Sequence, residues 1–281
     1  MNSMNITQAQ IQEYANYLKR EERAKGTIEK YVRDVSRFAE WIGNRVITKE
    51  VVTEWKNYLL ELKYCPSTVN SMLASLHGFF HFTGIEGCNV KFLRIQRKIF
   101  RSRDKELNKA EYQKLVNAAL SKNNERLALL IETICATGIR VSEVQYITIE
   151  AVKSGRAEVI LKGKVRTILI PGKLAKKLKY YAKKRKIKAG EIFLTKNGTG
   201  LSRKQIWAEM KSICKKAGVE ESKVFPHNLR HLFARTFYKT SKDIVRLADV
   251  LGHSNIETTR IYLITTCTEY MRWLDGLKLV C

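Results

Sequence analysis

A lysine, two arginines, two histidines and a tyrosine in the second half of the chain are together suited to breaking a phosphodiester bond. Without a metal, that reaction needs a nucleophile, cations on the non-bridging oxygens, and groups that move protons. Arginine suits the oxygens because its guanidinium binds two at once and stays protonated. The sequence shows no convincing acidic cluster for two magnesium ions, which favours a metal-free route. The candidates are Arg140, Lys162, His227, Arg230, His253 and Tyr262.

The sequence predicts where several of these residues lie relative to the helices. Arg140 directly follows the end of a predicted helix. His227 and Arg230 stand three residues apart and therefore share one helical face. His253 ends another predicted helix, and Tyr262 follows it by nine residues.

Five short motifs occur in order through this part of the chain. T-G-x-R-x-S-E begins at Thr137, K-G-K at Lys162, H-x-L-R-H at His227 and L-G-H at Leu251, with Tyr262 nine residues beyond the last histidine. Each motif is weak alone, but five in this order and spacing form a strong signal. The order resembles the tyrosine recombinases, the phage-type integrase family. The compact size is similar to Xer-type recombinases and to small transposon or phage integrases.

The resemblance implies a role for each phosphate-binding candidate. Arg140 and Arg230 would clamp the scissile phosphate and stabilise the charge of its transition state. His253 would hydrogen-bond a phosphate oxygen. Glu143 would support the site indirectly, by orienting the nearby catalytic groups.

The resemblance also implies how protons and the covalent bond move. Tyr262 would attack the phosphorus and form a 3′-phosphotyrosyl link, and His227 would assist proton transfer at the tyrosine. Lys162 would protonate the departing 5′ oxygen, although Lys164 is an alternative for this role. Tyr270 is the rival nucleophile, disfavoured by its longer spacing from the L-G-H histidine. No metal and no nucleotide cofactor is implied.

Each candidate also has a purely structural alternative. Arg140 could complement the dipole of a helix end. His227 could simply begin a helix, and His253 could cap the end of one. Tyr262 could be a core aromatic residue, and we expect His231 to serve in packing.

Composition narrows the partner. Lysine and arginine total 52 against 27 acidic residues, which gives a formal net charge of +25. Such a chain attracts a polyanion, so nucleic acid is the leading partner and an anionic membrane surface the weaker alternative. Six cysteines without a C-x-x-C pair argue against zinc and against a disulfide framework. No apolar run reaches the roughly 18 residues of a membrane span, and the N-terminus does not resemble a secretory signal. We expect a cytoplasmic, nucleoid-associated protein.

The elements that position the candidates are predicted to be mainly α-helical, with a small antiparallel β-sheet, in two domains. Apolar periodicity predicts four helices in residues 1–87, and this unit resembles the SAM-like core-binding domain of the family. Residues 88–107 are basic and lack a sustained period. We interpret them as an interdomain linker that either follows DNA phosphates or is a solvated loop. Residues 108–281 would form the α+β catalytic domain, ending in a tail helix at about 268–279.

Within the catalytic domain, two kinds of element are predicted. Helices are expected at about 109–121, 123–136, 202–217, 226–239, 241–251 and 255–263. Strands are expected at 157–161 and 167–170, with another small β element at 192–194.

Further cations are candidates for DNA contact. A basic cluster from Lys176 to Lys186 lies on a predicted helix and its end, and either touches DNA backbone or is a solvated face. The helix from about residue 202 either enters a major groove or presents a solvated face. The individual DNA-binding candidates are Arg94, Arg97, Lys98, Arg101, Arg103, Lys164, Arg166, Lys204 and Lys211.

The tail helix carries an apolar stripe that a short helix cannot bury alone. It docks either on its own domain or, as the resemblance implies, on a neighbouring subunit. The implied assembly is a homo-tetramer on two double-stranded DNA sites with inverted-repeat-like halves, joined by C-terminal helix exchange and monomeric in free solution. Accessory DNA-bending proteins are compatible with this, and a membrane is not involved. Two other functions stay open: a DNA-binding regulator that no longer cuts, and a DNA-relaxing enzyme of the type IB topoisomerase kind.

Overall fold

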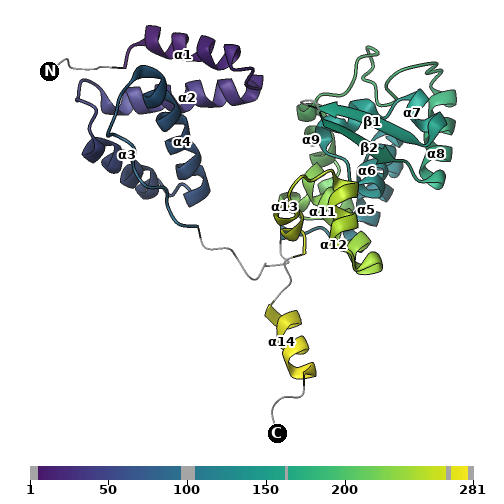
Figure 1. The fold of residues 1–281 in the computed structure, drawn as a ribbon. Coiled ribbons are helices and arrows are strands. Elements are labelled where there is room, and N and C mark those ends of the chain that lie inside the picture. The colour runs from purple at the N-terminus through teal and green to yellow at the C-terminus, as the bar shows by residue number, and fades with distance from the viewer. Residues whose placement is uncertain (1–5, 96–104, 162–163, 264–266, 278–281) are drawn as a thin grey trace. The chain divides into compact units, whose positions relative to one another are not determined.

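The computed structural model describes residues 6–95, 105–161, 164–263 and 267–277 (Figure 1). The chain divides into two compact units, Met1–Arg97 and Lys98–Cys281, and the dividing position falls inside the predicted linker. Both units are mainly helical, and the second also holds a two-stranded antiparallel sheet, which confirms the predicted fold class. None of the described helices is long and apolar enough to cross a membrane.

Four helices form the first unit. Threonine side chains start two of them: Thr7 accepts a hydrogen bond from the backbone N–H of Gln10, and Thr48 accepts one from Val51. The buried faces meet in a core rich in aromatic side chains, including Tyr14, Phe38, Trp55, Phe79 and Phe80. The helices are α1 (Gln8–Arg20), α2 (Lys25–Ile42), α3 (Lys49–Glu61) and α4 (Pro66–Thr83).

The segment after α4 differs from the predicted linker. Cys88 and Val90 are buried in the core of the first unit. The side-chain amide of Asn70 also donates to the backbone carbonyl of Leu93 and accepts from its N–H, at 2.9 and 2.8 Å. These apolar residues are too sparse to give a period, but they fill gaps between the helices. The packed unit therefore extends past residue 87.

The second unit is built around α6 (Glu125–Thr137), which packs against α5, α8 and α11. Its apolar residues are buried on almost every side, as expected of a central helix. The other helices of this unit are α5 (Lys109–Ser121), α7 (Ile149–Ser154), α8 (Gly172–Lys184), α9 (Arg203–Lys211), α10 (Cys214–Ala217), α11 (Pro226–Ser241), α12 (Ile244–Leu251), α13 (Ile256–Arg260) and α14 (Cys267–Gly276), with 3-10 helices η2 (Val141–Tyr146) and η3 (Glu221–Lys223).

The sheet pairs β1 (Arg156–Leu161) with β2 (Lys164–Leu169) in antiparallel register, with Arg156 opposite Leu169 and Leu161 opposite Lys164. The second strand thus begins three residues before its predicted start, because ladder pairing continues through the basic residues that follow the hairpin turn. Residues 192–194 do not form a strand. They contribute only an isolated bridge from Leu194 to Gly200.

Three helical predictions need correction. The predicted helix at 202–217 is interrupted between α9 and α10. The predicted helix at 255–263 already ends at Arg260, so the tyrosine at 262 follows it. Residues 141–154, for which the sequence predicts no helix, form η2 and α7, because Glu143 and Thr148 supply local caps that a search for apolar period misses.

Candidate active site

The first corner of the site is the turn that follows α6. Gly138 ends this helix with a φ of 64°, and a Cβ there would collide with the ring of Phe233. The chain then turns into η2. Arg140 precedes η2, and both its backbone N–H and its guanidinium donate to the Glu143 carboxylate, each at 2.8 Å. The Arg140 side chain stays 41% exposed, so part of its guanidinium faces solvent.

The Glu143 carboxylate joins two guanidinium groups. Its side chain is fully buried, and it also accepts a hydrogen bond from Arg166 of β2 at 2.6 Å. Burial raises the pKa of Glu143, but the Arg140 backbone N–H and the two guanidinium groups outweigh it and hold the pKa below its usual range. Arg166 also donates to the backbone carbonyl of Val250 at 2.8 Å, which ties β2 to α12. Glu143 therefore holds the Arg140 side chain in place.

Arg230 occupies the centre of the site and is only 1% exposed. It lies on α11, where its Nη1 donates to the Gly138 carbonyl at 2.5 Å and its Nη2 to the Leu251 carbonyl at 2.9 Å. Nη2 also lies 2.9 Å from Nε2 of His253, and Nε lies 3.4 Å from the Tyr262 hydroxyl. Burial lowers the pKa of Arg230 to about 10, which still leaves it protonated at neutral pH.

His253 follows the end of α12 at Gly252, which has a φ of 65°. Its Nδ1 lies 2.9 Å from the Thr259 hydroxyl. A guanidinium can only donate, so the Nε2 that faces Arg230 accepts, and Nδ1 carries the proton of the neutral ring. Burial, followed by the nearby charges of Arg230, Arg140 and Arg166, lowers the pKa of His253 to about 4. Donation to a phosphate oxygen would require a proton on Nε2.

Tyr262 is 3% exposed and is enclosed by imidazole rings. Its ring stacks on His253 with centroids 5.7 Å apart and planes 10° from parallel. His231 lies closer, at 4.4 Å, and His227 lies at 5.9 Å. His231 therefore packs against the candidate nucleophile. The sequence analysis expected His231 to serve in packing but did not identify Tyr262 as the residue it contacts.

The structure brings Arg140, His227, Arg230, His253 and Tyr262 together. Lys162 lies outside the described residues. The backbone of Lys164 forms the start of β2, and its side chain is not described.

The DNA-contact candidates fall into different environments. Arg94 and Lys204 are exposed, as surface contacts must be. Arg166 lies inside the unit with its side chain 10% exposed, so the prediction of a surface cation needs correction. Lys211 is half-buried, donates to the Glu221 carbonyl and stands over the Trp207 ring, so it is not a free surface charge. The remaining candidates, Arg97, Lys98, Arg101 and Arg103, lie outside the described residues.

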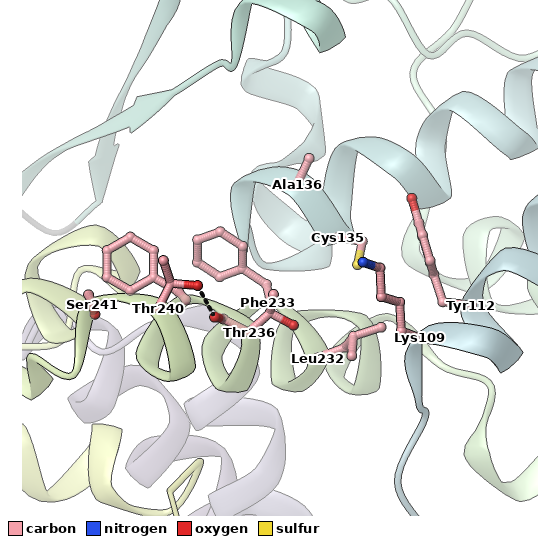
Figure 2. A pocket seen from close by; sticks show the side chains of 10 residues that line it. Lys109, Tyr112, Cys135, Ala136, Leu232, Phe233, Thr236, Thr240 and Ser241 are labelled. Carbon is pink, nitrogen blue, oxygen red and sulfur yellow. Dashed lines mark hydrogen bonds between the residues drawn. The ribbon is translucent and has the colours of Figure 1, made fainter.

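A groove of about 420 Å³ runs along α11 beyond Arg230, toward the C-terminal end of the helix. Figure 2 shows Phe233, Thr236 and Thr240 following one another along this helix. The lining of the groove is mainly apolar, and side chains of α5 and α6 complete it. The lining residues are Lys109, Tyr112, Cys135, Ala136, Leu232, Phe233, Thr236, Phe237, Thr240 and Ser241.

Comparison with known families gives two matches. The phage integrase family matches residues 105–267, which include all the assembled candidates. The N-terminal SAM-like domain of phage integrases matches residues 11–87.

Similar proteins are found by sequence and by structure. Tyrosine recombinase XerA of Pyrococcus furiosus is 30% identical over 281 residues, covering 96% of this chain and 94% of the relative. Tyrosine recombinase XerD of Listeria innocua is 29% identical, covering 85% and 88%. XerH bound to its difH substrate has a similar fold, with a TM-score of 0.71, 21% identity, and coverage of 98% and 85%. A lambda integrase tetramer on a Holliday junction gives a TM-score of 0.71, 18% identity, and coverage of 90% and 76%.

Proposed function

This chain belongs to the phage integrase family, and on that premise we propose that it is a site-specific tyrosine recombinase that cuts and rejoins DNA through a 3′-phosphotyrosyl intermediate. One observation carries the proposal. The Arg230 guanidinium lies within 3.4 Å of the Tyr262 hydroxyl and within 2.9 Å of His253. A phosphate bound by this guanidinium would therefore lie within reach of a phenolic nucleophile.

The proposed reaction exchanges one phosphate ester for another. The Tyr262 oxygen forms a bond to phosphorus while the bond from phosphorus to the 5′ oxygen breaks. Arg140 and Arg230 hold the non-bridging oxygens, His227 takes the phenolic proton, and Lys162 gives a proton to the 5′ oxygen. In resealing, a 5′ hydroxyl of the partner strand attacks the phosphotyrosine and the phenol leaves. The ester bond is conserved throughout, so ATP is not needed.

The fixed contacts of Arg230 support its role in the transition state. Two backbone carbonyls, at Gly138 and Leu251, hold the guanidinium in place. Its contacts to Tyr262 and His253 are made by side chains that can exchange for phosphate oxygens. Because the cation is already oriented, little reorganisation is needed as charge develops on the phosphate.

A suicide substrate nicked near the cleavage point tests the proposal. The wild-type protein should form a denaturant-resistant covalent adduct with this DNA, and Tyr262→Phe should form none while still binding it. Tyr270→Phe is the matched control, since it removes the rival phenol and should leave the adduct unchanged. An adduct that persists in Tyr262→Phe, or disappears only in Tyr270→Phe, would overturn the assignment. Binding by the wild type without any adduct would identify the chain as a regulator.

The proposed partner is double-stranded DNA with paired, inverted-repeat-like sites, on which four copies assemble. The α14 helix of one copy would dock in the α11 groove of the next. Met271 and Leu274 of this helix and Leu277 directly after it are apolar and exposed, and they recur at intervals of three. The groove offers a complementary apolar lining. Since DNA is the substrate, we place the protein in the cytoplasm with the nucleoid.

Deleting residues 268–281 should spare binding to a single DNA site but weaken pairing of two sites and recombination. Thr236→Arg, which fills the groove, should produce the same defect from the acceptor side. The assay scores recombination of two sites on one plasmid together with its relaxation. An unchanged recombination yield from the truncated protein contradicts the docking. Relaxation without recombination by the full chain would favour a topoisomerase-like enzyme.

A further inference from the structure

The outer face of α8 and the segment directly after it form a strongly basic surface that the active site does not use. Nine cations lie between residues 173 and 188, without an acidic residue among them, and all nine are exposed. The opposite side of the helix, including Leu174, Leu178 and Tyr181, is buried in the core. The cations are Lys173, Lys176, Lys177, Lys179, Lys183, Lys184, Arg185, Lys186 and Lys188.

Two of these lysines are neutralised within the fold. Lys177 pairs with Glu132 at 2.6 Å, and Lys184 pairs with Glu125 at 2.7 Å, both glutamates being on α6. Lys176, Lys179 and Lys183 follow one another at intervals of three and four, so they share another face. Within the described part of the chain, no ion pair joins these three to a carboxylate. Their mutual repulsion favours an external anion.

This surface runs antiparallel along α6, because Lys177 pairs with Glu132 in the second half of α6 and Lys184 pairs with Glu125 at its start. Its Lys183 end is therefore remote from the catalytic residues. The pairing of Lys184 with Glu125 places the end of α8 beside the start of α6. The catalytic turn lies at the other end of α6, and a helix of 13 residues is about 20 Å long at 1.5 Å per residue. Figure 1 shows α8 and α13 at opposite sides of this unit. A phosphate bound at Arg230 therefore cannot also contact Lys183 at the far end of α8.

The residue types favour the DNA backbone over other anionic partners. Lysine is a flexible point charge that contacts phosphates without reading bases. A protein interface would need apolar and aromatic anchors, and this face offers only Tyr180. A membrane-bound helix would need apolar side chains to enter the lipid, and those of α8 are buried in the core.

We propose that the outer face of α8, centred on Lys176, Lys179 and Lys183, binds the sugar–phosphate backbone of duplex DNA that lies outside the catalytic pocket. The inference rests on the proposed function in so far as DNA is the substrate. It adds a second, sequence-independent contact surface, which would engage either the flank of the bound duplex or another duplex.

The test compares Lys176→Gln/Lys179→Gln/Lys183→Gln with the charge-preserving triple Lys→Arg variant. Each phosphate contact contributes about 0.9 to the slope of log affinity against log salt, so the Gln variant should lose roughly 2 to 3 from this slope on long DNA. Its affinity for long DNA should fall at least about tenfold at moderate salt. The Arg variant should match the wild type. A short duplex limited to the core site should be bound and cleaved equally by all three proteins.

Two binding measurements distinguish contacts to the DNA that flanks the core site from contacts to a second DNA molecule. A long duplex with a central core site reports flank contacts, and a short core duplex plus a random-sequence duplex reports contacts to a second molecule. Loss in either arm supports the proposal, and an unchanged salt slope in both overturns it. Loss of binding only to anionic lipid vesicles would assign the surface to a membrane and also overturn it. If no protein cleaves the core duplex, the proposed recombinase activity fails, while the salt slopes still decide the role of α8. Unchanged thermal melting of the Gln variant excludes misfolding.

Discussion

The catalytic pocket and the outer face of α8 both gather cations, but they hold them differently. In the pocket, Arg230 is buried and fixed by two backbone carbonyls, and Glu143 joins Arg140 to Arg166. On α8, the lysines lie in solvent, and only two of them have carboxylate partners among the described residues. Fixed geometry suits a transition state, whereas mobile charge suits a backbone of repeating phosphates. The type of cation should therefore matter in the pocket, and only the number of charges should matter on α8.

The sharpest test of this difference is Arg230→Lys. An ammonium cannot reach the Gly138 and Leu251 carbonyls and also bind two phosphate oxygens, since it lacks the planar fork. Removing one preorganised donor set of this kind typically costs about 10²- to 10³-fold in rate. Covalent adduct formation measured in single turnover should fall by this factor, with DNA affinity nearly unchanged. A lysine variant that cleaves at the wild-type rate would show that charge alone suffices in the pocket, as we expect of α8.

Glu143→Gln tests whether the pocket depends on its buried carboxylate. The substitution leaves the Arg166 guanidinium buried without a counter-charge, which typically destabilises a fold by about 3 to 5 kcal/mol. Urea unfolding should reveal this loss. Glu125→Gln is the matched control, because it breaks the exposed pair with Lys184 and should cost less than about 1 kcal/mol. Equal losses of unfolding free energy in Glu143→Gln and Glu125→Gln would contradict the proposed difference between the catalytic pocket and the outer face of α8.

The pH dependence of stability offers a smaller test at His253. Its pKa is lowered from 6.5 in the unfolded chain to about 4 in the fold. Between these two values the folded state binds fewer protons than the unfolded chain. The stabilisation that comes from the neutral His253 ring is therefore complete above pH 6.5 and is lost as pH falls from 6.5 to 4. The loss is at most about 1.4 kcal/mol per pH unit, reduced by the partial exposure of the ring. His253→Gln should flatten the unfolding free energy over this window, and an unchanged slope would contradict the neutral ring.

The sequence was sufficient to find the catalytic candidates of the pocket but not the residues that pack against them and hold them in place. Arg140, Arg230 and Tyr262 stand in motifs whose order is diagnostic, and they meet as predicted. Arg166 was interpreted as a surface cation, because no local pattern reveals that Glu143, 23 residues earlier in the chain, lies beside it. The same limit applies to His231, whose packing on Tyr262 depends on the path of the chain after α12.

For the fold, periodicity predicted long helices well and short elements poorly. The four helices of the first unit and α6 carry apolar stripes over three or more turns. In contrast, η2 and α7 are only six residues long each, and they are specified by caps and tertiary packing. Cys88 and Val90 were assigned to a linker for a related reason, since two isolated apolar residues have no period. Their burial becomes evident only once the neighbouring helices are placed.

The two carbonyls that grip Arg230 belong to the ends of helices, at Gly138 after α6 and at Leu251 of α12. Helix ends of this polarity carry partial negative charge. They partly neutralise the guanidinium, so a small mobile anion such as inorganic phosphate gains less there than it would at a bare cation. A DNA phosphate, held in place by contacts along the rest of the duplex, does not depend on that local attraction. We therefore expect the two carbonyls to lower the affinity of the pocket for free phosphate ions and nucleotides.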